Sequence, residues 1–86
     1  MKNNMTPKKI KLSELKKGES AMIDSIEGEE FSIKIQEMGC VPGEMIKMER
    51  TAPLGDPIMI RVLGYKLSIR KEDAEKIWVT PKVAAG

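Results

Sequence analysis

The sequence predicts a small, mainly β protein with short helices, whose five strands close into a barrel. Three observations predict this fold class. The 86 residues suffice for one domain with a single core. Apolar and polar residues alternate over several short runs, and turn signals containing Gly or Pro separate those runs at close intervals. Closing the sheet removes the edges through which short strands otherwise aggregate.

The folded unit is expected to begin at Ile10, because residues 1–9 lack apolar periodicity and predict a flexible tail. Ser13 stands where it can cap a short helical turn, which Gly18 then ends. Residues 20–26 have the composition of a strand. The N-terminal part is therefore predicted to be a turn followed by a strand.

Residues 29–38 fit two patterns. Their apolar side chains alternate as in a strand over 31–35, and they also recur at helical spacing as far as Met38. Two glutamates in the first turn favour the positive end of a helix dipole, and Gly39 supplies a left-handed stop. These features predict a helix.

A chain reversal is expected after this helix. Residues 41–44 suit a type II turn, because Pro42 takes its second position and Gly43 takes its third, which needs a positive φ. Residues 45–49 then alternate with period two, which predicts a half-buried strand.

The next segment predicts a hairpin. Residues 52–55 suit a type I turn, and apolar side chains alternate over 58–62 and again over 67–69. A two-residue loop made of Gly64 and Tyr65 is expected to join the two strands.

The C-terminal part predicts a helix and a last strand. Residues 71–77 have helix-forming composition over two turns, and residues 78–80 are β-branched or aromatic. Pro81 stops this strand, so the domain is expected to span 10–80 and residues 81–86 to form a second flexible tail.

The composition excludes several classes of function. The chain has no His, the usual general base and the commonest transition-metal ligand, and its single Cys40 cannot form a disulfide or a thiolate zinc site. Aromatic residues make up 3%, too few for base stacking, and 15 Lys+Arg against 13 Asp+Glu are too balanced for a nucleic-acid footprint. We expect no enzyme, no resident cofactor or metal, and no nucleic-acid partner.

The chain is also expected to be cytoplasmic and not inserted in a membrane. It contains no run of about 18 apolar residues. Residues 1–7 are polar where a signal peptide would carry an apolar segment.

Several residues admit both a structural and a functional interpretation. Cys40 could bind metal, but a lone cysteine is more often a core residue. Four carboxylates could hold a ferrous or magnesium ion, yet nothing in the sequence makes them converge; they belong to Glu29, Glu30, Glu49 and Asp56. The seven methionines are expected to fill gaps in the core.

Two charged features remain. Asp56 lies in a loop, where its side chain can bond nearby backbone amides or be offered to a partner; the structural role is favoured. Five lysines near the N-terminus could attract anionic lipid or RNA, although a solubilising face is favoured; they are Lys8, Lys9, Lys11, Lys16 and Lys17.

Two motifs in this order resemble the FeoA family. They are Glu37-Met38-Gly39-Cys40-Val41-Pro42-Gly43-Glu44 and Thr51-Ala52-Pro53-Leu54-Gly55-Asp56-Pro57-Ile58. A Leu-x-x-Leu opening before Gly18 and the run Leu67-Ser68-Ile69-Arg70 extend the resemblance over residues 12–79. Six residues of these motifs are predicted to fix the backbone at turns: Gly39, Pro42, Gly43, Pro53, Gly55 and Pro57.

The resemblance implies an SH3-like β-barrel and an accessory, regulatory role in ferrous iron uptake. The implied partner is a membrane ferrous iron permease with a GTPase domain, of the FeoB type, on its cytoplasmic side. Similar domains form the C-terminal part of iron-dependent transcriptional repressors. A regulatory module of that kind, or a small barrel that binds nucleic acid, is therefore the alternative.

We hypothesise that the outer surface of the predicted hairpin and the loop before it contact the permease. Alternation turns the side chains at 59, 61 and 63 outward, and Met and Arg are enriched at interfaces. The candidate partner-binding residues are Met59, Arg61, Leu63, Arg70, Leu54 and Asp56.

Overall fold

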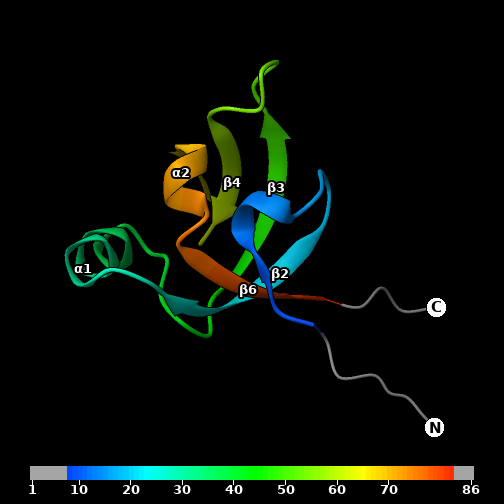
Figure 1. The fold of residues 1–86 in the computed structure, drawn as a ribbon. Helices are drawn as coiled ribbons and strands as arrows, with labels where there is room; N and C mark the ends of the chain where they lie inside the picture. The colour runs from blue at the N-terminus through cyan, green and yellow to red at the C-terminus, as the bar shows by residue number, and fades with distance from the viewer. Residues whose placement is uncertain (1–7, 83–86) are drawn as a thin grey trace, which may run out of the picture.

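The structure, a computed structural model, describes residues 8–82. Within this range the chain forms a six-stranded antiparallel sheet with the strand order β1-β6-β2-β3-β4-β5, together with two short α-helices and one 3-10 helix. The elements in chain order are β1 (Ile10–Lys11), η1 (Leu12–Glu14), β2 (Ser20–Ile26), α1 (Glu29–Glu37), β3 (Met45–Thr51), β4 (Ile58–Val62), β5 (Tyr65–Ile69), α2 (Lys71–Ala74) and β6 (Ile77–Pro81). The sheet curls around the core, and α1 stands to one side of it (Figure 1).

The mainly β fold class with short helices is confirmed, but the strand count was one too low, and the predicted closure of the sheet is not complete, because the strand order of residues 8–82 ends in β1 on one side and β5 on the other. The additional strand is β1, in which Ile10 pairs with Val79 and Lys11 pairs with Trp78 of β6. A strand of two residues is too short to show any alternation, so the sequence pattern could not reveal it.

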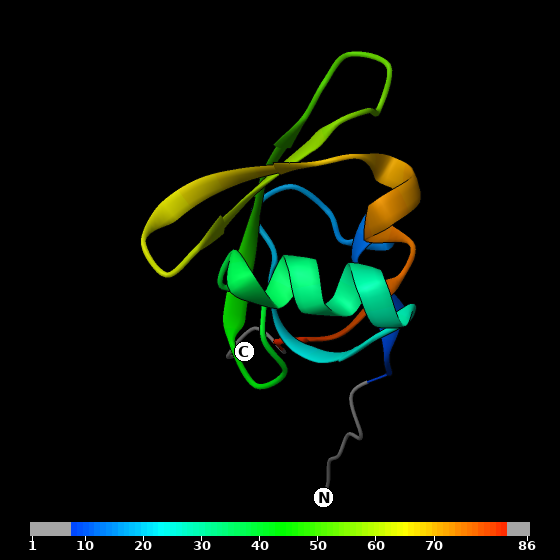
Figure 2. The ribbon, with the colours of Figure 1, turned by 90° about the vertical axis from the view of Figure 1, so that its left-hand side faces the viewer.

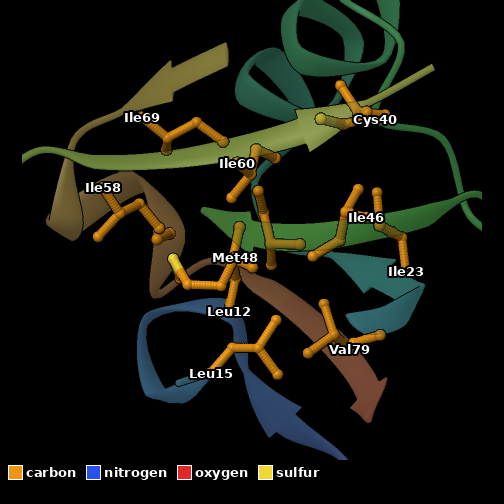
Figure 3. Packing of buried hydrophobic residues seen from close by; sticks show 14 of the residues in the cluster. Leu12, Leu15, Ile23, Cys40, Ile46, Met48, Ile58, Ile60, Ile69 and Val79 are labelled. Atoms are coloured by element: carbon orange, nitrogen blue, oxygen red, sulfur yellow. The ribbon is translucent and has the colours of Figure 1, made fainter. Parts of the chain in front are cut away.

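The core fills the inside of the curled sheet. Alternation is clean in β4, where Ile58, Ile60 and Val62 are buried between half-buried Met59 and Arg61. The buried side chains of β2, β3, β5 and β6 converge on the same interior (Figure 3). Each large aliphatic side chain buried there contributes about 1.5–3 kcal/mol to folding.

The first helical turn begins earlier than expected. Ser13 lies inside η1 and caps nothing; instead the Glu14 carboxylate accepts a hydrogen bond from the Lys11 N–H at 2.9 Å. The turn buries Leu12 and Leu15 against the core. An acidic residue at the third helical position can satisfy the N-cap amide, and here it does so in place of the serine.

Two of the predicted features around the first motif are confirmed. The segment with two possible patterns is a helix, α1, and Gly39 follows it with φ +102°. The turn at 41–44 is closed by the Glu44 N–H, which donates to the Val41 carbonyl at 3.0 Å, while Gly43 has φ +96°.

Of the next two predicted turns, the first is confirmed and the second is displaced by one residue. The turn at 52–55 is present, with the Gly55 N–H donating to the Ala52 carbonyl at 2.7 Å. The hairpin loop was placed one residue late, because it consists of Leu63 and Gly64, with φ 51° and 84°. Tyr65 opens β5, opposite Val62. Positive φ at both central residues is the type I′ geometry that matches strand twist.

The C-terminal helix is shorter than predicted. α2 is a single turn, Lys71–Ala74, and Ile77 already belongs to β6, where it pairs with Ile26 and is fully buried. Strand pairing and burial of Ile77 outweigh the helix propensity of the residues before it. β6 includes Pro81, and both predicted tails lie mostly outside the described residues.

Candidate docking surface

The predicted partner-binding residues lie along the β4–β5 hairpin and the loop that precedes it. Leu54 stands at the tip of the β3–β4 loop with 96% of its surface exposed, the most exposed large apolar residue described. Leu63 lies at the opposite end of the hairpin and is 60% exposed. These two residues therefore lie in loops at opposite ends of β4 and do not form one patch.

Arg61 is tied to neighbouring groups. Its Nε lies 3.1 Å from Oε2 of Glu49 on β3, and its Nη1 donates to the Gly64 carbonyl at 3.2 Å. The hydrogen bond from Arg61 to Glu49 holds the pKa of the Glu49 carboxyl below its ordinary value, and the charges of Arg61, Lys47 and Lys66 lower this pKa further. Cations thus surround one carboxylate on the outer face of the sheet.

Asp56 and Arg70 line one small hollow at the base of the hairpin. The Asp56 Oδ1 accepts the Lys71 N–H at 3.0 Å, so this carboxylate satisfies the first amide of α2 across 15 positions of the chain. Arg70 is exposed and lines the same small hollow, together with Pro57, Ser68 and Glu72. The structural role favoured for Asp56 is the one that the geometry supports.

Met59 and Leu63 do not continue one row of outward side chains. Met59 is half-buried on the outer face of the sheet, where it pairs with Ser68 of β5. Leu63 lies in the turn and approaches Gly39 beside the Tyr65 hydroxyl. The strict alternation used to place Leu63 therefore ends at the last residue of β4.

The carboxylates considered for metal binding remain dispersed. Glu29 and Glu30 stand in the first turn of α1, Glu49 is bonded to Arg61, and Asp56 is bonded to Lys71. Across residues 8–82, no group of three or more acidic or cysteine side chains is arranged to hold a metal ion.

Cys40 is a core residue. It is fully buried, and burial raises the pKa of its thiol to about 11. In Figure 3 its sulfur lies between β4 and the helical segment. A thiol that holds its proton so tightly is a poor nucleophile and a poor metal ligand.

Some of the N-terminal lysines are engaged with the sheet. The Lys9 Nζ lies 2.9 Å from Oδ2 of Asp24, and the Lys11 Nζ lies 5.7 Å from the ring centre of Trp78. No helix formed by residues 8–82 has the length and apolar character needed to cross a membrane.

Sequence reasoning missed a groove between α1 and β5. Ile33, 58% exposed, and Met38 both line this groove. The signal was available: on a helix, Ile33 lies about 200° around the axis from Phe31, so it cannot share the buried stripe of Phe31 and Ile35.

A family model described as the FeoA domain matches residues 10–81 of the chain. The chain belongs to the FeoA family. Membership confirms the resemblance carried by the two motifs, and it agrees with the prediction of an accessory protein rather than an enzyme.

One curated relative of this FeoA-family chain joins two proteins in a single polypeptide. It is the Fe(2+) transport protein A/Fe(2+) transporter FeoB fusion protein of Porphyromonas gingivalis (strain ATCC BAA-308 / W83). The two sequences are 45% identical over 71 residues, which is 81% of this chain. The chain spans 8% of that relative's length.

Solved structures confirm the SH3-like fold. The NMR structure of a FeoA-like protein from Clostridium acetobutylicum is 36% identical, with a TM-score of 0.83 and 95% of each chain covered. The FeoA of Stenotrophomonas maltophilia, described as a prokaryotic SH3 domain protein, is 25% identical, with a TM-score of 0.74, 88% of this chain covered and 99% of that chain.

A solved structure of lower sequence identity shares the fold as well. The crystal structure of T. acidophilum IdeR is 24% identical, with a TM-score of 0.77, and the match covers 93% of this FeoA-family chain and 37% of that chain. At this identity the likeness shows the fold alone.

Proposed function

We propose that this FeoA-family protein is a cytoplasmic accessory protein of ferrous iron uptake, and that it regulates uptake by docking on the cytoplasmic part of a membrane permease with a GTPase domain. The observation that carries the proposal is the Porphyromonas gingivalis fusion, in which a region 45% identical to this chain is joined to a FeoB transporter. Covalent joining holds two proteins at high effective concentration, which is useful where they act together.

The chemistry of the chain supports docking over catalysis or ion carriage. It has no His, and its one thiol is buried. What it presents to a partner is an SH3-like sheet with exposed apolar side chains in the loops before and after β4, Leu54 and Leu63. Small barrels of this shape commonly bind protein segments along their strands and loops.

Leu54 is the best anchor on this surface. An apolar side chain that is 96% exposed gains the full transfer free energy when a partner covers it, about 1.5–3 kcal/mol. Its burial costs little rearrangement because the Ala52–Gly55 hydrogen bond already closes the loop.

The test is calorimetric titration of the protein into the purified cytoplasmic domain of the permease from the same organism. We expect a saturable isotherm that Leu54→Asp weakens at least tenfold. Met22→Asp, which changes an exposed methionine of β2 away from the hairpin, is the matched control and should bind like the parent. An absence of binding by the folded parent protein would overturn the proposal.

A further inference from the structure

β5 is an edge of the sheet formed by residues 8–82, since β4 is its single strand neighbour. The two-residue loop makes Val62 and Tyr65 a hydrogen-bonded pair, and pairs alternate from there along the hairpin. Lys66 and Ser68 are therefore the residues whose backbone N–H and C=O groups point away from β4. No hydrogen bond from another described residue reaches these groups.

The edge faces a groove and not a covering element. α1 runs alongside β5, with its first turn toward α2 and its end toward the hairpin tip (Figure 2). The groove between them is open and has a volume of about 770 Å³. β5 is about 17 Å long at 3.3 Å per residue, and α1 is about 14 Å long at 1.5 Å per residue, so the two walls match in length.

The two sides of this edge differ in chemistry. On the outer face, Lys66 pairs with Arg61, which in turn pairs with Lys47, so a row of cations crosses three strands. Among residues 8–82, Glu49 alone offsets these cations by a direct contact, its ion pair with Arg61. On the side of the groove, α1 contributes apolar surface from Phe31 and Ile33, with Met38 just beyond its last turn, and two side chains of opposite charge, Glu30 and Lys34.

We propose that the β5 edge binds an extended segment of the partner as an additional strand. Side chains of an added strand alternate between the two faces. The segment that fits carries acidic residues on the side of Lys66 and β-branched apolar residues on the side of Ile33. This proposal rests on the proposed function for the identity of the partner, and it specifies the class of peptide that the partner presents.

Charge separates this occupant from a second copy of the chain. Antiparallel pairing of β5 with itself, centred on Ser68, places Lys66 of each copy opposite Arg70 of the other. Like charges directly opposite each other destabilise a strand pair, and lysine at an edge is a common guard against self-association. The same cations attract an acidic strand, so the charges along β5 disfavour pairing with a second copy of the chain and favour an acidic segment of the partner.

The first experiment maps the edge by NMR. The ¹⁵N-labelled protein is titrated with a blocked heptapeptide of alternating Glu and Val, and in parallel with the Lys and Val counterpart. We expect the Glu-Val peptide to shift the amides of Lys66 and Ser68 with saturation in the millimolar range, and the Lys-Val peptide to bind at least tenfold more weakly.

Variants test the two contacts separately, the backbone hydrogen bonds of the β5 edge and the apolar wall of the groove. Ser68→Pro deletes the outward N–H, a change that an edge strand tolerates, and Ile33→Asp places a charge on the apolar wall. Each should weaken the Glu-Val peptide at least tenfold. Met45→Asp, an exposed methionine outside the groove, is the matched control and should change binding less than twofold. Should Ser68→Pro fail to fold, Ile33→Asp carries the test.

Three results would overturn the inference. They are unshifted Lys66 and Ser68 amides, equal binding of both peptides, and edge shifts that grow with protein concentration without peptide, which would indicate a second copy. If the permease domain binds the parent and both groove variants alike, the edge is not the site while the proposed function stands. If the permease domain fails to bind but the peptide titration succeeds, the proposed function fails and the edge preference stands.

Discussion

Among the glycines of residues 8–82, Gly39 is the one at which an added methyl group would be most crowded. It has φ +102°, and a Cβ there would lie 2.9 Å from the Tyr65 hydroxyl and 3.0 Å from a Leu63 methyl. Gly43 has a comparable φ of +96° but open space around it. A comparison of substitutions at Gly39 and Gly43 therefore separates the cost of backbone strain from the cost of steric crowding.

We expect Gly43→Ala to lower the free energy of unfolding by about 1–2 kcal/mol, from the strain of a positive φ alone. Gly39→Ala should cost about 1 kcal/mol more, because Leu63 and Tyr65 must also move. Urea denaturation of both variants measures the difference. Equal losses would show that the two side chains yield at no cost.

Glu49 and Arg61 make the stability of this sheet face dependent on pH. The pKa of the Glu49 carboxyl is lowered in the folded state, so its contribution is present above the ordinary glutamate value of 4.5 and is lost as pH falls below it. We expect Glu49→Gln to lower the melting temperature at pH 7, and we expect this difference from the parent to shrink as the pH falls below 4.5. A difference that stays the same as the pH falls from 7 through the acid range would argue against this origin.

The same contact changes how interface variants should be chosen. Arg61→Glu would set a second carboxylate against Glu49, so its binding effect would be mixed with a loss of stability. Leu54→Asp is cleaner, because Leu54 touches solvent and little else.

The burial of Cys40 predicts that its thiol is unreactive in the folded protein. A rise in thiol pKa from 9.0 to about 11 lowers the thiolate fraction at pH 8 about 100-fold, and the side chain is also inaccessible. We expect a thiol-reactive chromogenic reagent to label the native protein at least 100-fold more slowly than the urea-unfolded protein. Comparable rates would place Cys40 at the surface.

Among the elements, α2 depends on a residue far from it in the chain. The helix has one turn, too few residues to nucleate alone, and its Arg70 N-cap offers no side-chain oxygen. Asp56 supplies that oxygen to the Lys71 N–H. The β3–β4 loop is thereby fastened to the junction of β5 and α2.

Removal of this acceptor should therefore destabilise the protein. We expect Asp56→Ala to cost about 1 kcal/mol of stability, as the loss of a helix cap does, and Asp56→Asn to restore most of it, since its amide oxygen also accepts. Thermal unfolding with both variants measures this. An Asp56→Asn variant as unstable as Asp56→Ala would assign the effect to charge.

The elements also show where sequence patterns succeed and fail. α1 and β2 to β5 were predictable because glycine and proline mark their ends and alternation marks their faces. β1 has two residues and no pattern, and α2 lost Ile77 to strand pairing with Ile26. The hairpin loop was misplaced because Leu63, with φ 51°, takes a conformation that a leucine rarely adopts.

At the scale of the whole molecule, the sequence predicted which residues face outward better than which of them meet. Its motifs located Leu54, Asp56 and Arg70, but the Asp56 contact with α2 joins positions 15 apart, and no local pattern encodes it. The exposure of Ile33 could be read from its helical spacing to Phe31, but the groove itself could not, since it arises where α1 is folded back beside β5.

The final prediction concerns the ion itself. Ferrous iron needs a preformed set of nitrogen, oxygen or thiolate ligands. This chain has no His, its thiol is buried with a pKa of about 11, and the acidic side chains of residues 8–82 form no group of three. The proposed docking role does not require the chain to hold the ion.

We therefore expect anaerobic calorimetry with ferrous salt to give no saturable heat at concentrations up to hundreds of micromolar. Titration of the Glu29→Gln and Asp56→Asn variants controls for weak carboxylate binding, and both should match the parent. A one-to-one isotherm at micromolar affinity that either substitution abolishes would show that the chain carries iron, and the docking role would then have to include ion transfer.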